Sequence, residues 1–215
     1  MFYQEAKDDA LRFGDVIVGF VLTAANVDAP DVSPASKSYS IDVAAPAYSV
    51  VLSPCCEIGD KTITLTPLIS LRQSLFDNPY FVEDLTRINR KMQPEQALPP
   101  LAWQKLPEEE KLKRIGQGSQ HQLLDLFVYE RHDLFKKYVI HKKGGGQVET
   151  DYHMISFKNT YKVNCEKITT AKDSPIYIKC LQLSVGTRAE LREKLGYYFG
   201  RPAPEDIDLL EDHAS

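Results

Sequence analysis

The 215-residue chain is poor in cysteine, which excludes a small scaffold built on disulfides. Its four cysteines are Cys55, Cys56, Cys165 and Cys180, too few and too irregularly spaced for a disulfide framework in a chain of this length. They form no CxxC pair, the spacing with which many zinc sites begin. We expect a reduced, cytoplasmic protein.

The chain also lacks a strong excess of charge and a long apolar segment. Its formal net charge is -4, which argues against a surface wholly built for nucleic acid but allows a local basic face. The longest apolar run, residues 16–25, is about ten residues long, roughly half of what a bilayer requires. No basic leader precedes this run, so we expect neither a membrane span nor a signal peptide.

What the chain has is the composition of an ordinary globular protein. With 43% hydrophobic and 26% charged residues, it can bury a sizeable core. Strand-like segments lie at both ends, and a polar, helix-rich insertion over residues 72–120 lies between them. We expect a single domain over 1–215, with a β core and a C-terminal helix formed by 1–71 and 121–200. The acidic tail, 201–215, should be loose.

Segments rich in β-branched residues or alternating in polarity predict the strands. They are residues 15–22, 38–43, 48–53, 61–66, 123–129, 138–141, 152–157 and 176–183. Gly59 and Asp60 are a turn signal, so 48–66 is a predicted hairpin. Residues 26–37, rich in Asp, Pro and Ser, predict an exposed loop. The glycines at 144–146 form a turn but no phosphate-binding loop, since no helix with a lysine-serine pair follows them.

Three segments predict helices. An asparagine and a proline open the first, over 78–92, and residues 106–115 form a short charged helix. In the C-terminal helix, Thr187 and Glu190 have the spacing of a capping box, in which both side chains satisfy free backbone donors. Apolar residues then recur on one helical face through about residue 199.

The adjacent Cys55 and Cys56 at a strand end allow three interpretations. A zinc site would need Cys56 together with distant partners such as His153, Cys165 or Cys180, because neighbouring side chains of an extended chain point to opposite sides. A catalytic thiolate would need a base nearby. The simplest interpretation is that these small, readily buried residues fill the strand end. We therefore expect no metal and no cofactor.

A basic cluster with interleaved aromatic rings is the second candidate site. Its cations are Arg131, Lys136, Lys137, Lys142 and Lys143, and its rings are Phe127, Tyr129, Phe135 and Tyr138. Cations for phosphates and rings for base stacking are what single-stranded RNA requires. The simpler alternative is a hairpin whose rings face the core and whose lysines face water.

The order of the first strands resembles the MazF/PemK toxin family. The resemblance rests on the strand that begins with Gly14 and Asp15, on the strand at 48–53, and on a third strand, 63–69, that contains Pro67. It implies an SH3-like barrel within an α+β, mainly β fold, in a family whose toxins are dimeric and cut single-stranded RNA. The motif Leu-Ser-x-x-Cys-Glu-Ile, together with Tyr-Phe-x-Arg near the C-terminus, also resembles bacterial proteins from defence-related gene neighbourhoods.

Residue by residue, the resemblance argues against the toxins' catalysis. Their catalytic arginine precedes the second strand, where this chain has Ala47 and Tyr48, and their serine or threonine corresponds to Ser53. RNA cleavage needs a cation for the charged phosphorus intermediate and a group that moves the 2′-hydroxyl proton, and Ser53 supplies neither.

We therefore expect a non-catalytic regulatory or adaptor protein of a prokaryotic defence or stress system. It would bind a protein partner through residues 72–120, and it could form a homodimer. The alternative is an endoribonuclease toxin with a rearranged site, in which a lysine such as Lys61 replaces the arginine.

Overall fold

The computed structural model describes residues 1–6, 8, 10–28, 37–54, 57–58, 61–116, 123–164 and 176–200. The fold is α+β with more strand (33%) than helix (30%), which confirms the predicted class. The predicted turn at 59–60, the predicted tail 201–215 and Cys55, Cys56 and Cys165 lie outside the described residues.

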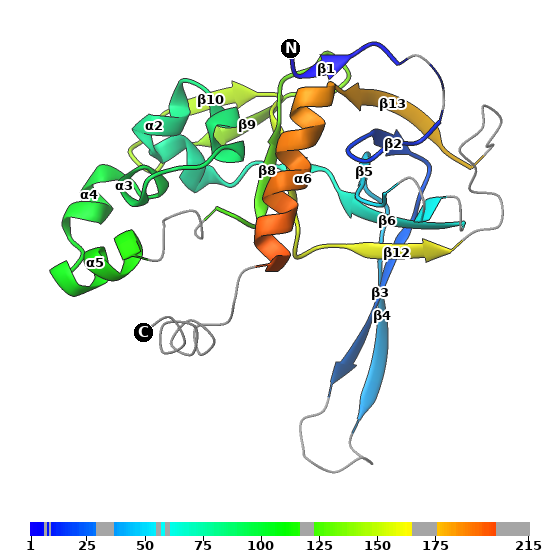
Figure 1. Cartoon of the computed structure of the whole chain (residues 1–215), viewed down its shortest axis with the longest axis horizontal. Helices are drawn as coiled ribbons and strands as arrows, with labels where there is room; N and C mark the ends of the chain where they lie inside the picture. Colours follow the sequence, from blue (N-terminus) through cyan, green and yellow to red (C-terminus); the bar gives the residue numbers. More distant parts are fainter. Residues whose placement is uncertain are drawn as a thin grey trace, which may run out of the picture.

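The larger sheet has six antiparallel strands in the order β1-β13-β2-β5-β6-β12 (Figure 1). These strands are β1 (Tyr3–Gln4), β2 (Val16–Val18), β5 (Ser49–Val51), β6 (Thr62–Pro67), β12 (Tyr161–Asn164) and β13 (Ile178–Leu183). β5 and β6 pair antiparallel, Val50 opposite Thr66, so the predicted hairpin over 48–66 is confirmed.

A smaller sheet has the order β7-β11-β8, and a two-stranded ribbon, β9–β10, lies beside it. Their bounds are β7 (Ile69–Ser70), β8 (Leu126–Tyr129), β9 (Tyr138–His141), β10 (Gln147–Thr150) and β11 (His153–Ser156). Both sheets are open, and the described strands close no barrel. The SH3-like barrel therefore stays a prediction.

The predicted strand over 15–22 is interrupted at Gly19. The residue has φ +113°, and a Cβ placed on it would lie 2.7 Å from the carbonyl oxygen of Ile176, so the bend requires glycine. Beyond it, β3 (Leu22–Asp28) pairs with β4 (Ser38–Ala44) along their whole length. The loop predicted from residue 26 was therefore wrong for 26–28, where cross-strand pairing extends the strand.

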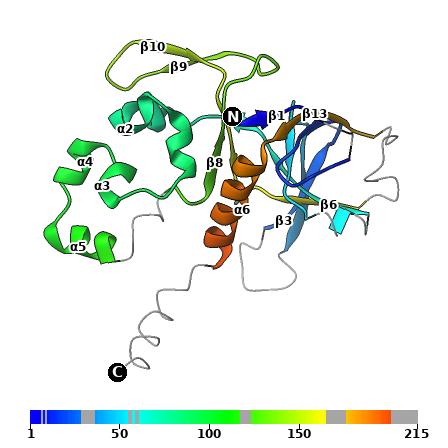
Figure 2. The same ribbon diagram turned by 45° about the horizontal axis from the view of Figure 1, so that its top comes forward.

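Among the described residues, six short helices follow β7 in the chain and precede β8. They lie together on one side of the structure (Figures 1 and 2). They are the 3-10 helices η2 (Gln73–Asp77) and η3 (Leu85–Asn89), and the α-helices α2 (Pro79–Val82), α3 (Pro94–Ala97), α4 (Pro100–Gln104) and α5 (Glu108–Gly116). The single helix predicted over 78–92 was wrong. Asp84 is extended and its carboxylate accepts a hydrogen bond from the amide of Thr86, so it ends α2 and starts η3.

The C-terminal helix α6 (Val185–Gly200) lies between the short helices and the six-stranded sheet (Figure 2). It starts earlier than predicted, because Ser184 is the capping residue and accepts from the amide of Thr187 at 3.3 Å. The predicted capping box was therefore wrong, and Thr187 lies inside the helix. No helix among the described residues has the length and apolar character to cross a membrane.

Three hydrophobic clusters hold these elements together. The first joins both sheets to α6 through Phe157 and Leu191, and the second packs η2, α2 and η3 on β8 and β11. The third lies on the six-stranded sheet around Ile17 and Ile63. Asn89, at the end of η3, is bonded to the backbone of Val128 in β8: its amide nitrogen donates to the carbonyl at 2.8 Å and its oxygen accepts from the N–H at 2.7 Å.

Candidate functional site

A cavity of about 490 Å³ opens beside the ends of β2, β5, β7 and β11 and beside the chain that enters β9. We call it the His153 groove. Its lining includes Tyr48, Ser70, Lys136, Lys137, Tyr138 and His153. Ala47 also lines it.

His153 is the first residue of β11 and is 9% exposed. Its Nδ1 lies 2.9 Å from the carbonyl oxygen of Asp151. Because a carbonyl oxygen can only accept, Nδ1 carries the proton and Nε2 keeps a free lone pair. Burial lowers the pKa of His153, which keeps the ring neutral near pH 7. The residue therefore has the protonation state of a general base.

Two neighbours determine how the imidazole lies in the groove. Phe135 is buried and its ring centroid lies 4.8 Å from that of His153, while Tyr138 meets the imidazole edge-on at 5.4 Å. Ser70 of β7 lies directly opposite His153 in the antiparallel register, so both side chains leave the sheet on the same face. A hydroxyl and an imidazole thus lie side by side.

Lys136 and Lys137 follow Phe135 and are both exposed. The ammonium of Lys137 lies 3.1 Å from the carboxylate of Glu149, whereas Lys136 forms no ion pair within the described part of the chain. No Asp or Glu is among the groove's lining residues. The lining therefore carries two ammonium groups, of which that of Lys136 is available to contact a phosphate.

Two tyrosine rings form apolar walls. The hydroxyl of Tyr48 donates to the carbonyl of Leu134 at 2.7 Å, and that of Tyr138 donates to the carbonyl of Tyr152 and accepts from the amide of Leu71. Burial raises the pKa of Tyr138 to about 12, so it stays neutral. Both rings are held at their hydroxyl ends, which fixes their orientation for stacking.

The structure divides the predicted basic cluster. Arg131 lies over the ring of Tyr152, with its guanidinium carbon 4.9 Å from the ring centroid, and Lys142 and Lys143 lie at the β9–β10 turn. None of these three lines the His153 groove. Phe127 and Tyr129 are fully buried and are core residues, as the simpler interpretation had them.

Ser53 has a structural position. It is 0% exposed; its hydroxyl accepts from the amide of Thr64 at 2.7 Å and donates to the carboxylate of Glu57 at 3.0 Å. The bond to Thr64 fastens the segment after β5 to β6. Neither Ser53 nor Lys61 lines the His153 groove.

The weak metal candidates do not converge among the described residues. Cys180 of β13 is half-buried, burial raises its thiol pKa, and its sulfur contacts the carbonyl of Ile178. Within the described part of the chain, no group of three or more His, Cys, Asp or Glu residues could hold a metal ion.

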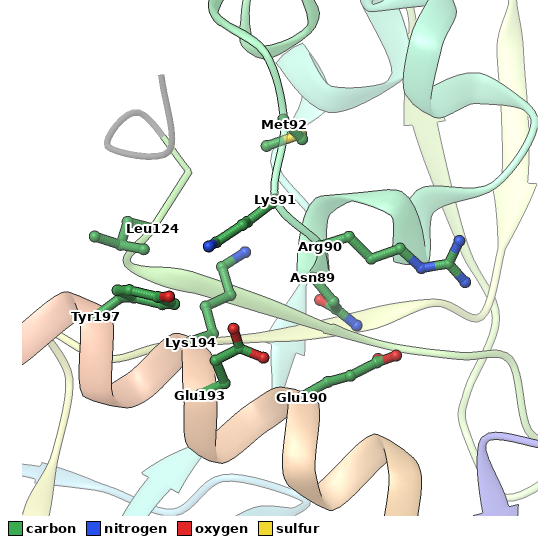
Figure 3. Close-up of a pocket in the computed structure, with 9 residues that line it drawn as sticks. All are labelled: Asn89, Arg90, Lys91, Met92, Leu124, Glu190, Glu193, Lys194 and Tyr197. Atoms are coloured by element: carbon green, nitrogen blue, oxygen red, sulfur yellow. The ribbon is translucent and has the colours of Figure 1, made fainter. Parts of the chain in front are cut away.

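A second cavity, of about 280 Å³, lies between the end of η3 and α6 (Figure 3). Lys194 reaches into it from α6, is 6% exposed, and donates to the carbonyl of Ile88. Burial lowers the pKa of Lys194 to about 7, against the opposing effect of the Asp125 carboxylate. Glu190 and Glu193 also line this cavity. We call it the Lys194 cavity.

The sequence named His153 only as a metal ligand and missed Lys194. One sequence feature could have indicated His153 as a site residue. It lies in a predicted strand, and the pairing of this strand with 126–129 brings His153 beside the aromatic and basic residues that follow β8. Lys194 carries no such signal, because a lysine on an amphipathic helix is normally at the surface.

Comparison with protein-family models, curated proteins and solved structures gives no match. The resemblance to the MazF/PemK family therefore stays a prediction.

Proposed function

We propose that the protein is an endoribonuclease that cleaves single-stranded RNA in the His153 groove. The observation that carries the proposal is the bond from Nδ1 of His153 to the Asp151 carbonyl, which leaves Nε2 as an acceptor; the exposed Lys136 lines the same groove. A base and a cation are the two groups that Ser53 does not supply. The proposal keeps the alternative prediction of a toxin with a rearranged site but replaces Lys61, the cation named there, with Lys136.

The chemistry follows from these two groups. Nε2 of His153 takes the proton of a ribose 2′-hydroxyl, and the 2′-oxygen attacks the adjacent phosphorus. Lys136 and Lys137 stabilise the charge on the phosphorus intermediate. The bond from phosphorus to the 5′-oxygen then breaks; that oxygen takes a proton from water, and His153 returns its own proton to solvent. The products are a 2′,3′-cyclic phosphate and a 5′-hydroxyl.

The walls of the groove favour a single strand over a duplex. Tyr48 and Tyr138 offer ring faces on which unpaired bases stack, at about 1–3 kcal/mol per base. The lysines contact the backbone without reading the base sequence. We therefore expect cleavage with little sequence preference.

The test is the cleavage of a labelled single-stranded RNA by the wild type and by His153→Asn. Asparagine can still donate to the Asp151 carbonyl but has no basic nitrogen, so the rate should fall by about 10²- to 10⁴-fold. His141→Asn is the matched control, because His141 is exposed on β9, away from the groove. Intact RNA with the wild type, or unchanged cleavage by His153→Asn, would refute the proposal.

A second function, binding of a regulatory protein partner, is favoured by the surface of α4 and α5. Helix α5 contains no buried residue, and Leu112 and Ile115 are 67% and 53% exposed, as is Leu101 of α4 at 71%. These residues belong to the insertion at 72–120, where the adaptor hypothesis placed its partner. Leu112 and Ile115 are three residues apart and lie on one face of α5, and such a face suits an amphipathic helix of another protein.

The adaptor hypothesis predicts a partner that co-purifies in fixed stoichiometry from the native host and is lost with Leu112→Glu. Lys113→Glu, the neighbouring exposed position, is the control for charge. If RNA also stays intact, the partner-binding role alone accounts for the protein.

A further inference from the structure

The β3–β4 ribbon is the one pair of strands in Figure 1 that extends well beyond the body of the described structure. It pairs over seven residues on each strand, from Leu22 opposite Ala44 to Asp28 opposite Ser38. Apart from Leu22, which is buried, and two partly buried alanines, all of its residues are exposed.

The ribbon has two different faces. Directly opposite residues share a face and alternate along the strand, which places Thr23, Ala25 and Val27 with Val43, Ile41 and Tyr39. The exposed fractions are 58% for Val27, 76% for Tyr39, 70% for Ile41 and 67% for Val43. The opposite face is polar, where the Asn26 amide donates to the Asp42 carboxylate at 2.7 Å.

Such a surface is costly to leave in water. Soluble monomers rarely expose contiguous apolar patches of this kind, and a two-stranded ribbon without a packed face is marginally stable. The apolar face carries no charged residue, so a complementary surface has to be uncharged as well.

We propose that the apolar face of the β3–β4 ribbon packs on the same face of a second copy of this chain, forming a two-fold dimer. The face carries no charge, so two copies can meet on it without burying an unpaired charge, as an isologous apolar interface requires. Complete burial of the four large side chains would remove roughly 500 Å² per copy, or about 1,000 Å² in the pair, which is about the least that a biological interface buries.

The central pair of the face, Ala25 opposite Ile41, lies near the two-fold axis in this arrangement. The small Ala25 leaves room for the Ile41 of the second copy, and the two ribbons pack about 10 Å apart, as stacked sheets do. The proposal does not depend on the ribonuclease activity, since no ribbon residue lines the His153 groove.

The test compares two adjacent positions of β4 by sedimentation velocity. Ile41→Asp places a carboxylate on the apolar face, and Ser40→Asp places the same charge on the polar face. We expect a dimer for the wild type and for Ser40→Asp, and an increase in the dissociation constant of at least about 100-fold for Ile41→Asp. The protein is measured over a dilution series that starts at about 100 µM. A wild type that is monomeric even at the highest concentration, or an Ile41→Asp variant that is as dimeric as the wild type, overturns the proposal.

A second experiment covers the case in which Ile41→Asp disturbs the ribbon itself. A short bismaleimide should link Ala25→Cys into a covalent dimer, whereas Asn26→Cys, on the other face, and the parent protein with its native cysteines should not be linked. Equal linking of the two variants, or none, contradicts the packing of apolar face on apolar face.

Discussion

His153 and Lys194 are alike in three respects and differ in one. Each is a buried nitrogen base, burial lowers the pKa of each, and each is bonded to a backbone carbonyl. The difference is the charge around them. The His153 groove is lined by two lysines and no carboxylate, whereas Glu190 and Glu193 line the Lys194 cavity beside Lys91 and Arg90.

In the proposed ribonuclease, a phosphodiester would meet two lysines and no lining carboxylate in the His153 groove. At the Lys194 cavity, Glu190 and Glu193 offset part of the positive charge of the lysines and the arginine beside them. The ammonium of Lys91 there lies 5.1 Å from the centre of the Tyr197 ring, and its hydrogen bond to Tyr197 and the charge of Glu193 raise its pKa. We infer that Lys194 holds α6 to the end of η3, and that burial alone does not identify a catalytic residue.

The largest expected effect concerns the pH dependence of RNA cleavage. His153 must be neutral to act as a base, and burial places its pKa below the ordinary 6.5. Activity should therefore be flat above neutral pH and fall about tenfold for each pH unit below the pKa. The measurement is kcat/KM against pH for the wild type and for Lys194→Met. The same profile in both proteins would mean that the titrating group lies in the His153 groove. A profile altered by Lys194→Met would mean that Lys194 also takes part, contrary to the comparison.

The second prediction concerns stability and Lys194. The pKa in the folded state is about 7 against 10.5 for an ordinary lysine, so between these values the unfolded state binds more protons. The free energy of unfolding should thus rise with pH from 7 toward 10, by up to about 1.4 kcal/mol per pH unit. Lys194→Met should lack this rise. Urea unfolding at pH 7 and 9 measures it, and an equal change of stability with pH in both proteins would contradict the lowered pKa of Lys194.

Charged groups lie on every element packed around Lys194, but besides burial only the charge of Asp125 among the described residues shifts its pKa. Asp125, before β8, is the carboxylate whose charge raises its pKa; Glu190, Glu193 and Tyr197 come from α6, and Arg90 and Lys91 follow η3. Glu193→Gln should therefore leave the slope of stability between pH 7 and 9 nearly unchanged, whereas Asp125→Asn should steepen it, because the pKa of Lys194 falls further.

The third prediction separates the two lysines of the groove. Lys136 forms no ion pair among the described residues, whereas Lys137 pairs with Glu149. Lys136→Ala should therefore weaken single-stranded RNA binding by about tenfold at low salt, and Lys137→Ala by less. Fluorescence anisotropy measures both, with Lys142→Ala at the β9–β10 turn as the control outside the groove. An equal loss from all three would mean that the groove has no special role in binding.

The smallest effect is expected at Ser53, a third buried polar group. Ser53→Ala leaves the amide of Thr64 without its hydroxyl acceptor, which should lower the free energy of unfolding by about 1–2 kcal/mol. RNA cleavage should not change at temperatures where the variant is folded. Loss of cleavage in a folded Ser53→Ala protein would move the chemistry from the groove to the end of β5.

The elements with strong local signals were predictable from the sequence. The strand 138–141, the strand at 38–43 and the charged helix near 106–115 correspond to β9, β4 and α5. The helix over 78–92 failed because the capping propensity of one aspartate, Asp84, outweighed the helical pattern around it.

The site was only partly predictable, because long-range pairing assembles it. Lys136 and Lys137 were recognised as part of a basic cluster, but their place beside His153 depends on the pairing of β8 with β11 and on the anchoring of Phe135. No local pattern encodes which cations of the cluster face the groove. Burial of Lys194 likewise depends on where α6 meets η3.

The paired bonds between Asn89 and the backbone of Val128 have a consequence for the solubility of the protein. β8 is the outer strand of its sheet, and the exposed amide and carbonyl of an outer strand recruit strands from other molecules. The side chain of Asn89 carries one donor and one acceptor in the positions that a neighbouring peptide would use. Together with the packing of η3 on β8, the side chain of Asn89 thus keeps other strands from this edge. Asn89→Leu should increase aggregation, which light scattering on heating would measure.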